Sequence, residues 1–152
     1  MNMSKGDQAK ELFLSGHNCA QAVLCAYREE LGLTQEQAIA MSACFGGGLG
    51  GQREVCGAVS AMCMVLSLKY APKDPKDHAA KSAFYVRIQE VCNRFKQENG
   101  SIICRELLGL TPGQEPAAPQ PRNAQYYQRR PCPDKVKSAA DILEQYLAEQ
   151  SK

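Results

Sequence analysis

The chain has 152 residues, of which 44% are hydrophobic and 22% charged, and its formal net charge is +2. This composition is typical of a single globular domain, and the charge is too small to indicate binding to nucleic acid or to an anionic membrane. The N-terminal residues lack the apolar core of a signal peptide, and no apolar run approaches the roughly 20 residues of a membrane span. We therefore expect a cytoplasmic protein without direct membrane insertion.

The N-terminal third of the chain carries three helical patterns. A short amphipathic helix ends near Gly16. Asn18 can cap a second helix, whose apolar residues recur at helical spacing until Gly32. The sequence TQEQ at residues 34–37 matches a capping box, which predicts a third helix running to about Cys44.

A glycine-rich loop follows, and after it a strongly apolar helix is predicted from about residue 53 to residue 70. Its AMCMVLSL segment has the composition of a helix that is buried on most sides. Asp74-Pro75 is a good start for the next helix, because a capping residue precedes a proline, and Asn99-Gly100 ends it. One apolar stripe marks the inner face of this helix: Ala80, Phe84, Ile88, Val91, Cys92 and Phe95.

The C-terminal third is interrupted by prolines. Ser101 can cap a short helix through Leu108. Residues 109–133 hold six of the eight prolines, which predicts a long loop without helix. Pro133-Asp134 opens the last helix, with an inner face made of Val136, Ala140, Leu143, Tyr146 and Leu147. No strand-like alternation is present, so the sequence predicts an all-α fold: one domain, residues 1–152, forming a bundle of about five to seven helices.

The glycine loop allows several interpretations. Gly46, Gly48 and Gly51 have the spacing of a dinucleotide fingerprint, but that motif requires a preceding strand, and a helix pattern precedes this loop. No Gly-Lys-Ser/Thr follows, which also excludes a P-loop. Gly46 can instead cap a helix, with the remaining glycines forming a flexible turn. Alternatively, the glycines let backbone N–H groups approach an anion such as a thiolate or a sulfur cluster.

The eight cysteines fall into two groups, and permanent disulfides are unexpected in a reducing compartment. Four cysteines lie on apolar helix faces or at a helix end, where cysteine acts as a small hydrophobic residue: Cys25, Cys44, Cys63 and Cys92. The other four lie at predicted helix N-termini: Cys19, Cys56, Cys104 and Cys132. Unpaired N–H groups and the helix dipole favour the thiolate there, and the thiolate is both nucleophile and metal ligand. Four such cysteines on four helices can converge at one end of a bundle.

Several segments resemble the redox-active family labelled C-GCAxxG-C-C, whose members carry four characteristic cysteines. They are NCAQ at residues 18–21, FGGGLG at 45–50, CGA at 56–58, CRELLG at 104–109 and the single Cys132. The resemblance implies that the family's four cysteines are Cys19, Cys56, Cys104 and Cys132, with a redox or metal-binding role. It also implies a functional link to a transporter. One difference is that the CGAxxG motif ends here in Ala61, not in glycine.

Three functions remain open from the sequence. In thiol redox chemistry, two cysteines cycle between dithiol and disulfide with a redox partner. Cys19 and Cys56 are the expected reactive pair: His17 is a candidate base near Cys19, and the glycine loop adjoins Cys56. Five glycines are expected to shape this site: Gly46, Gly47, Gly48, Gly50 and Gly57.

In the second alternative, the same four cysteines bind a [2Fe–2S] cluster or zinc. In the third, the protein is a noncatalytic interaction module. Its candidate contact is the RNAQYYQRRP stretch, with Tyr126, Tyr127, Arg129 and Arg130, which could meet an acidic partner. The alternative for that stretch is a loop whose tyrosines pack back on the bundle.

Overall fold

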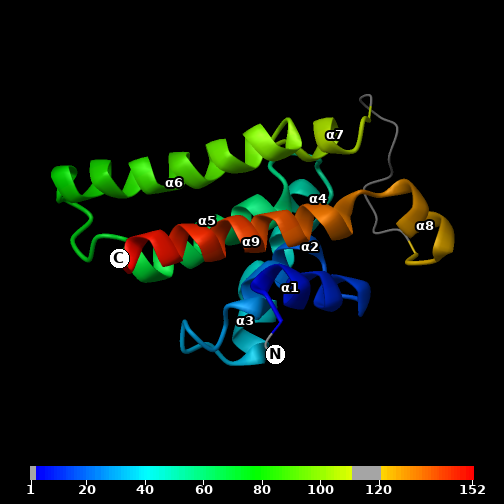
Figure 1. The fold of residues 1–152 in the computed structure, drawn as a ribbon, viewed down its shortest axis with the longest axis horizontal. Coiled ribbons are helices and arrows are strands. Elements are labelled where there is room, and N and C mark those ends of the chain that lie inside the picture. The colour runs from blue at the N-terminus through cyan, green and yellow to red at the C-terminus, as the bar shows by residue number, and fades with distance from the viewer. Residues whose placement is uncertain (1–2, 111–120) are drawn as a thin grey trace.

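The computed structural model describes residues 3–110 and 121–152, except for the side chains of residues 127–129. The predicted all-α bundle is confirmed (Figure 1): the described residues contain helices and one isolated β-bridge, between Val55 and Ile103. The helices are α1 (Lys5–Leu14), α2 (Cys19–Ala26), α3 (Gln35–Ser42), α4 (Gly46–Leu49), α5 (Gly57–Tyr70), α6 (His78–Asn99), α7 (Cys104–Leu107), α8 (Ala124–Arg129) and α9 (Cys132–Gln150), with a 3-10 turn at Ala43–Phe45. Of the described helices, none is both long and apolar enough to cross a membrane.

The long helices are stacked in layers, and the short ones gather at one end. Figure 1 shows α6 on one side, α5 and α9 in the middle and α1 to α3 on the other side. The short helices α4, α7 and α8 lie toward the end of the molecule at which α9 begins. This end also holds the N-termini of α2 and α5, so most of the glycine-rich and cysteine-bearing segments meet there.

The core forms around α2 and α5. Six of the eight residues of α2 are buried, and Tyr27, which ends this helix, is 1% exposed and donates its hydroxyl hydrogen to the Ala140 carbonyl of α9 at 2.8 Å. This hydrogen bond satisfies the one polar atom of a large buried side chain. The predicted burial of α5 holds for Ala61, Met62, Val65 and Leu66, whereas Leu68 is 47% exposed.

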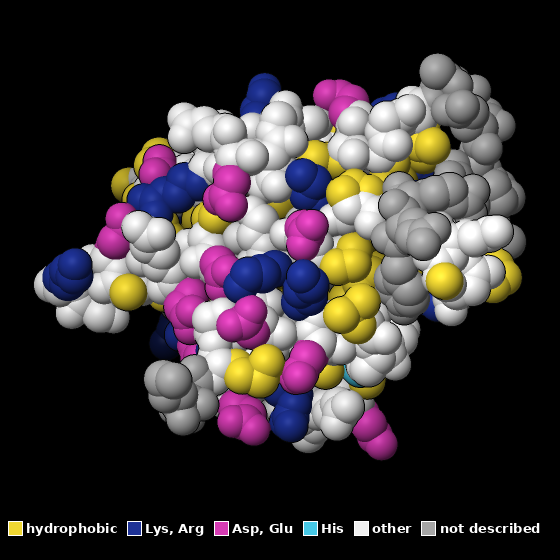
Figure 2. Space-filling model, turned by 45° about the vertical axis from the view of Figure 1, so that its right-hand side comes forward, with side chains coloured by type: hydrophobic (Ala, Val, Ile, Leu, Met, Phe, Trp, Pro, Cys, Tyr) yellow, Lys and Arg dark blue, Asp and Glu magenta, His cyan; other side chains and the backbone are white. Residues whose placement is uncertain are grey.

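Electrostatic contacts fasten α1 to α9 at the surface. Lys137 of α9 lies 2.8 Å from the Asp7 carboxylate of α1 and 3.1 Å from that of Asp141, and Lys10 of α1 lies 3.3 Å from Asp134. Figure 2 shows the same pattern over one face of the molecule, where Lys and Arg side chains lie among Asp and Glu side chains. Exposed ion pairs of this kind each contribute little to stability, about 0–1 kcal/mol.

Local signals predicted the N-terminal helices well. Both expected caps are present: Asn18 accepts a hydrogen bond from the Gln21 N–H, and Thr34 accepts one from the Gln37 N–H, each within a complete capping box. The second helix is shorter than predicted, because α2 ends at Ala26 and turns continue to Gly32.

Three predicted helix starts were wrong. The helix expected from residue 53 begins at Gly57, because Arg53 has a left-handed φ of 63° and the segment after it pairs with another part of the chain. Helix α6 begins at His78 with Asp77 as its cap, since the Asp74 carboxylate accepts from the Lys76 N–H in a separate turn. Ser101 likewise accepts from the Ile103 N–H, so that α7 begins only at Cys104.

The C-terminal prediction needs two corrections. Helix α8 lies inside the stretch 109–133, which was predicted to lack helix; residues 111–120 of that stretch lie outside the described residues. Helix α9 begins at Cys132 with Pro131 before it, one residue earlier than the predicted start at Pro133. The expected inner face of α9 is confirmed: Val136, Ala140, Leu143 and Tyr146 are buried, and Leu147 is half-buried.

Candidate functional site: a cavity lined by four cysteines

Two extended segments bring Cys56 and Cys104 together. The Cys56 N–H donates to the Ile102 carbonyl at 2.8 Å, and the Cys104 N–H donates to the Glu54 carbonyl at 2.6 Å. These bonds flank the bridge between Val55 and Ile103 and set the starts of α5 and α7 side by side. Cys56 is the N-cap residue of α5, and Cys104 is the first residue of α7.

A glycine allows the start of α5 to approach the start of α2. A Cβ atom on Gly57 would lie 2.7 Å from the Phe45 carbonyl oxygen and 3.2 Å from the Ala20 nitrogen, the first of which is closer than real Cβ contacts. Only glycine fits this position without movement of its neighbours. The close approach places Cys56 next to the N-terminus of α2, whose first residue is Cys19.

Helix α9 supplies the fourth cysteine. Cys132 is its first residue, and its thiol lies near enough to that of Cys19 for each to shift the pKa of the other. The four cysteines singled out by helix position in the sequence therefore all lie at or next to a helix start, and the fold brings those starts to one place.

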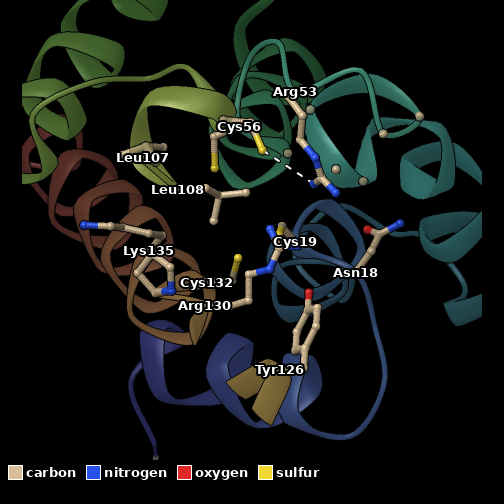
Figure 3. Close-up of a pocket in the computed structure, with 18 of the residues that line it drawn as sticks. Asn18, Cys19, Arg53, Cys56, Leu107, Leu108, Tyr126, Arg130, Cys132 and Lys135 are labelled. Carbon is tan, nitrogen blue, oxygen red and sulfur yellow. Dashed lines mark hydrogen bonds between the residues drawn. The ribbon is translucent and has the colours of Figure 1, made fainter. Parts of the chain in front are cut away.

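These helix starts surround a cavity of about 290 Å³. Figure 3 shows the cavity, with Cys19, Cys56 and Cys132 among the labelled side chains around it. Its described lining consists of Asn18, Cys19, Ala43, Gly46, Gly47, Gly48, Gly50, Gly51, Arg53, Cys56, Gly57, Cys104, Leu107, Leu108, Arg122, Tyr126, Arg130, Pro131, Cys132 and Lys135.

The charged side chains in this lining are all positive. Arg53 donates a hydrogen bond from Nη1 to the Cys104 Sγ, at 3.9 Å. Arg122 is held by the carbonyls of Phe13 and His17, at 3.0 and 2.9 Å, and Arg130 is 8% exposed. With Lys135, four cations and no carboxylate stand among the described lining residues. Such surroundings favour thiolates and anionic ligands.

The two directly interacting thiols differ in acidity. The hydrogen bond with Cys19 and the positive charges of Arg130, Arg122 and Arg53 lower the pKa of Cys132, although burial opposes them. The same hydrogen bond, burial and the neighbouring sulfurs raise the pKa of Cys19. The interaction with Cys19 and the positive charges of the arginines therefore both favour ionisation of Cys132 before that of Cys19.

The remaining two thiols stay protonated to higher pH. Burial raises the pKa of Cys56 to about 12, against the opposing effect of the Val59 and Ala58 N–H groups at the start of α5. Burial also raises the pKa of Cys104, and the hydrogen bond and charge of Arg53 partly offset this. The sequence suggested Cys19 and Cys56 as the reactive pair; in the structure the direct thiol partner of Cys19 is Cys132.

The glycine loop forms one wall of the cavity. Gly46, Gly47, Gly48, Gly50 and Gly57 all line it. Gly48 has a φ of 69°, and a Cβ atom there would lie 2.8 Å from the Arg53 Cα, so glycine is required where the chain folds back on itself. The loop follows helix α3 and the 3-10 turn, not a strand, and thus lacks the context of a dinucleotide fingerprint.

His17 does not line the cavity. Its Nδ1 lies 3.0 Å from the Leu12 carbonyl oxygen, which holds the ring against α1. The structure therefore gives no geometric support to His17 as a base for Cys19.

The other cysteines are placed in three different ways. Cys25 is buried in α2, as predicted. Cys44 is exposed, so its expected role as an apolar packing residue is wrong. Cys63 and Cys92 are half-buried, and their Sγ atoms lie 3.8 Å apart.

Sequence reasoning missed two of the three arginines of the site, and it gave the third, Arg130, a different role. No sequence pattern marked Arg53 or Arg122 as a site residue, because Arg53 follows the glycine loop and Arg122 lies in the proline-rich stretch. In the RNAQYYQRRP stretch, Tyr126 and Arg130 line the cavity, so this tyrosine packs back on the bundle. The side chains of Tyr127 and Arg129 lie outside the described residues.

The donor chemistry of the cavity suits a metal, but its geometry does not. Four thiols can ligate zinc or a [2Fe–2S] cluster. Among residues 3–110 and 121–152, however, no three Cys, His, Asp or Glu side chains lie close enough together to hold one ion. As placed, the sulfurs form one interacting pair, Cys19 with Cys132, and two further thiols.

Comparison with known sequences assigns the chain to a family. Residues 17–146 match the family described as "Putative redox-active protein (C_GCAxxG_C_C)", and the chain belongs to this family. The resemblance found in the cysteine-bearing motifs is thereby confirmed. Neither a curated protein nor a solved structure matches the chain.

Proposed function

We propose that the protein is a thiol–disulfide redox protein in which Cys132 is the nucleophile and Cys19 the resolving cysteine. The observation that supports this most strongly is that Cys19 and Cys132 line one cavity together with Arg53, Arg122 and Arg130, whose positive charges lower the pKa of Cys132. A lowered thiol pKa increases the thiolate fraction near neutral pH, and the thiolate is the attacking species.

The reaction that fits this arrangement is exchange with a disulfide-bearing partner. The Cys132 thiolate attacks one sulfur of the partner's disulfide; a mixed disulfide forms, the partner's S–S bond breaks and one thiolate leaves. Cys19 gives up its proton, attacks the Cys132 Sγ and expels the second thiolate. The dithiol thus transfers two electrons and two protons to the disulfide, which becomes two thiols, and a dithiol reductant reverses the process.

Cys56 and Cys104 support the pair from the same cavity. Both stay neutral to higher pH than Cys132, so they add little negative charge beside its thiolate. The four cationic side chains of the lining favour a partner that carries negative charge near its disulfide. Cytoplasmic location and a functional link to a transporter are part of this proposal.

The test uses the anionic aromatic disulfide 5,5′-dithiobis(2-nitrobenzoate), in a Cys44→Ser background because Cys44 is exposed. The Cys19–Cys132 pair should release two coloured thiolates from one reagent molecule and keep no adduct. Cys19→Ser should release one and keep the adduct on Cys132, identified by mass spectrometry. An adduct on Cys56 or Cys104 in place of Cys132, or a stable adduct on Cys132 with Cys19 present, contradicts the assignment.

A metal centre is the second candidate, favoured by the single observation that all four cysteines line one cavity. It requires the sulfurs to move closer together than they are placed. Iron, zinc and acid-labile sulfide measured in protein purified without air test it: stoichiometric iron and sulfide, lost in Cys104→Ala, would support a cluster.

A further inference from the structure

A second pair of cysteines lies outside the cavity. Cys63 is in the middle of α5 and Cys92 in the second half of α6, and their Sγ atoms are 3.8 Å apart. Neither residue lines the cavity. Cys63 follows Cys56 by two helical turns, or about 10 Å along the helix at 1.5 Å per residue. From the sequence these two cysteines were expected to be simple packing residues.

The antiparallel packing of α5 against α6 places Cys63 opposite Cys92. At one end of this pair of helices, the Cys56 N–H donates to the Ile102 carbonyl at 2.8 Å. At the other end, the Arg87 guanidinium lies 4.0 Å from the centre of the Tyr70 ring. The contact between Cys63 and Cys92 lies between these two contacts, so the antiparallel alignment brings the sulfurs together without a change of fold.

The pair also has the chemistry of a dithiol. The thiols share a hydrogen bond in which either sulfur can be the donor; it lowers the pKa of Cys92 and raises that of Cys63, which favours Cys92 as the attacking sulfur. Both residues are half-buried, so a small reagent reaches them more readily than the buried Cys25. A disulfide needs an S–S distance of about 2.0 Å, so its formation requires the two side chains to move closer together than the observed 3.8 Å contact.

We propose that Cys63 and Cys92 form a second redox-active dithiol, independent of the cavity, whose oxidation by a disulfide compound covalently joins α5 to α6. The Cys92 thiolate attacks one sulfur of the oxidant, whose S–S bond breaks as one thiolate leaves. Cys63 loses its proton, attacks the Cys92 Sγ and expels the second thiolate. Two electrons and two protons pass from the dithiol to the oxidant, which becomes two thiols.

The experiment treats the reduced full-length protein with oxidised glutathione and maps the products by fragmentation mass spectrometry. Fragmentation is needed because Cys56 and Cys63 lie in one tryptic peptide, Glu54–Lys69. The expected product is a Cys63–Cys92 disulfide in most molecules, reversed by reduced glutathione. It should be absent from Cys63→Ser and Cys92→Ser and unchanged in the control Cys25→Ser.

The same disulfide should form in Cys132→Ser, in which the reaction proposed for the cavity cannot occur. This variant separates the two proposals, because loss of cavity chemistry leaves the second dithiol intact. Glutathione retained on Cys92 beside a free Cys63 would overturn the inference. The inference would also be overturned if Cys63 and Cys92 both remained free thiols under conditions that modify the exposed Cys44. Both results are obtained with the wild-type protein, so neither depends on the folding of a variant.

Discussion

Arg53 Nη1 lies 3.9 Å from the Cys104 Sγ and donates a hydrogen bond to it. The two residues belong to segments that pair through backbone hydrogen bonds: the Arg105 N–H donates to the Arg53 carbonyl at 3.2 Å, and the Cys104 N–H to the Glu54 carbonyl at 2.6 Å. Arg53 has a left-handed φ of 63°, uncommon for a residue with a side chain. The backbone thus holds a cation beside a buried sulfur.

Replacing Arg53 by methionine should make the cavity thiols less acidic. The guanidinium lowers the pKa values of Cys104 and Cys132, so its loss raises both. At pH 7 we expect slower alkylation of both cysteines by iodoacetamide, by roughly three- to ten-fold, because a smaller fraction of each thiol is ionised. Peptide mapping of the alkylated cysteines gives the rates.

The matched control is Arg105→Met. Arg105 pairs with Glu54 at 2.6 Å in the same segments but does not line the cavity. Alkylation rates in this control should equal those of the wild type. Equal slowing in both variants would mean that the segment had rearranged, and that the charge of Arg53 was not the cause.

The hydrogen bond from Cys19 should set the reactivity of Cys132. Cys19→Ala removes the donor and raises the pKa of Cys132, so alkylation of Cys132 at pH 7 should slow roughly ten-fold, as expected for a hydrogen bond to a charged group. Cys19→Ser retains an O–H donor and should recover part of the rate. A plot of rate against pH should shift toward higher pH in Cys19→Ala without losing its plateau. A lower plateau with no shift would assign Cys19 a purely structural role.

Burial of Cys56 should make its contribution to stability depend on pH. Its folded-state pKa is raised from 9.0 to about 12, so the native state favours the neutral thiol. The resulting stabilisation is complete below pH 9 and is lost as the pH rises toward 12. A shift of this size corresponds to roughly 4 kcal/mol, since one pKa unit is about 1.4 kcal/mol.

Urea unfolding of wild type and Cys56→Ala between pH 7 and pH 11 measures this effect. The difference in free energy of unfolding between the two proteins should shrink steadily above pH 9. Comparison with the variant cancels the contributions of other groups that titrate in this range, Tyr27 among them. A difference that stays constant with pH would show that Cys56 titrates alike in the folded and unfolded states.

Gly57→Ala should destabilise the site and the fold together. The added methyl group would meet the Phe45 carbonyl oxygen at 2.7 Å, a backbone atom that cannot rotate away. We expect a loss of about 1–3 kcal/mol in the free energy of unfolding, the usual effect of overpacking. Ser67→Ala, on the exposed face of the same helix, is the control and should be near neutral. An unchanged stability in Gly57→Ala would mean that α2 and α5 are less tightly packed than the structure shows.

Most of the helices could be predicted from the sequence, because the signals that mark a helix come from residues close together in the chain. The capping boxes at Asn18 and Thr34 and the apolar face of α9 depend on residues only a few positions apart. The starts of α5 and α7 were misplaced, since they depend on pairing between segments about 50 residues apart, centred on Val55 and Ile103. Nothing in either segment alone indicates that pairing.

The candidate site was predictable in part for the same reason. Helix position selected the four cysteines that the fold brings to one cavity. It could not show that the thiols of Cys19 and Cys132 interact. Nor could it show that Arg122, which also lines the cavity, lies over the Phe13 ring at 4.2 Å. These contacts join the N-terminal helices to residues more than 100 positions away, and only the folded arrangement reveals them.

A redox titration of the intact protein tests the central claim most directly. The reduced protein is equilibrated in buffers of increasing ratio of oxidised to reduced dithiothreitol, free thiols are trapped, and the disulfides are mapped. The account predicts reversible two-electron formation of a Cys19–Cys132 disulfide, with Cys56 and Cys104 still reduced when it is half formed. A disulfide that joins Cys19 to Cys56 in its place, or Cys19 and Cys132 that stay reduced across the whole range, would contradict it.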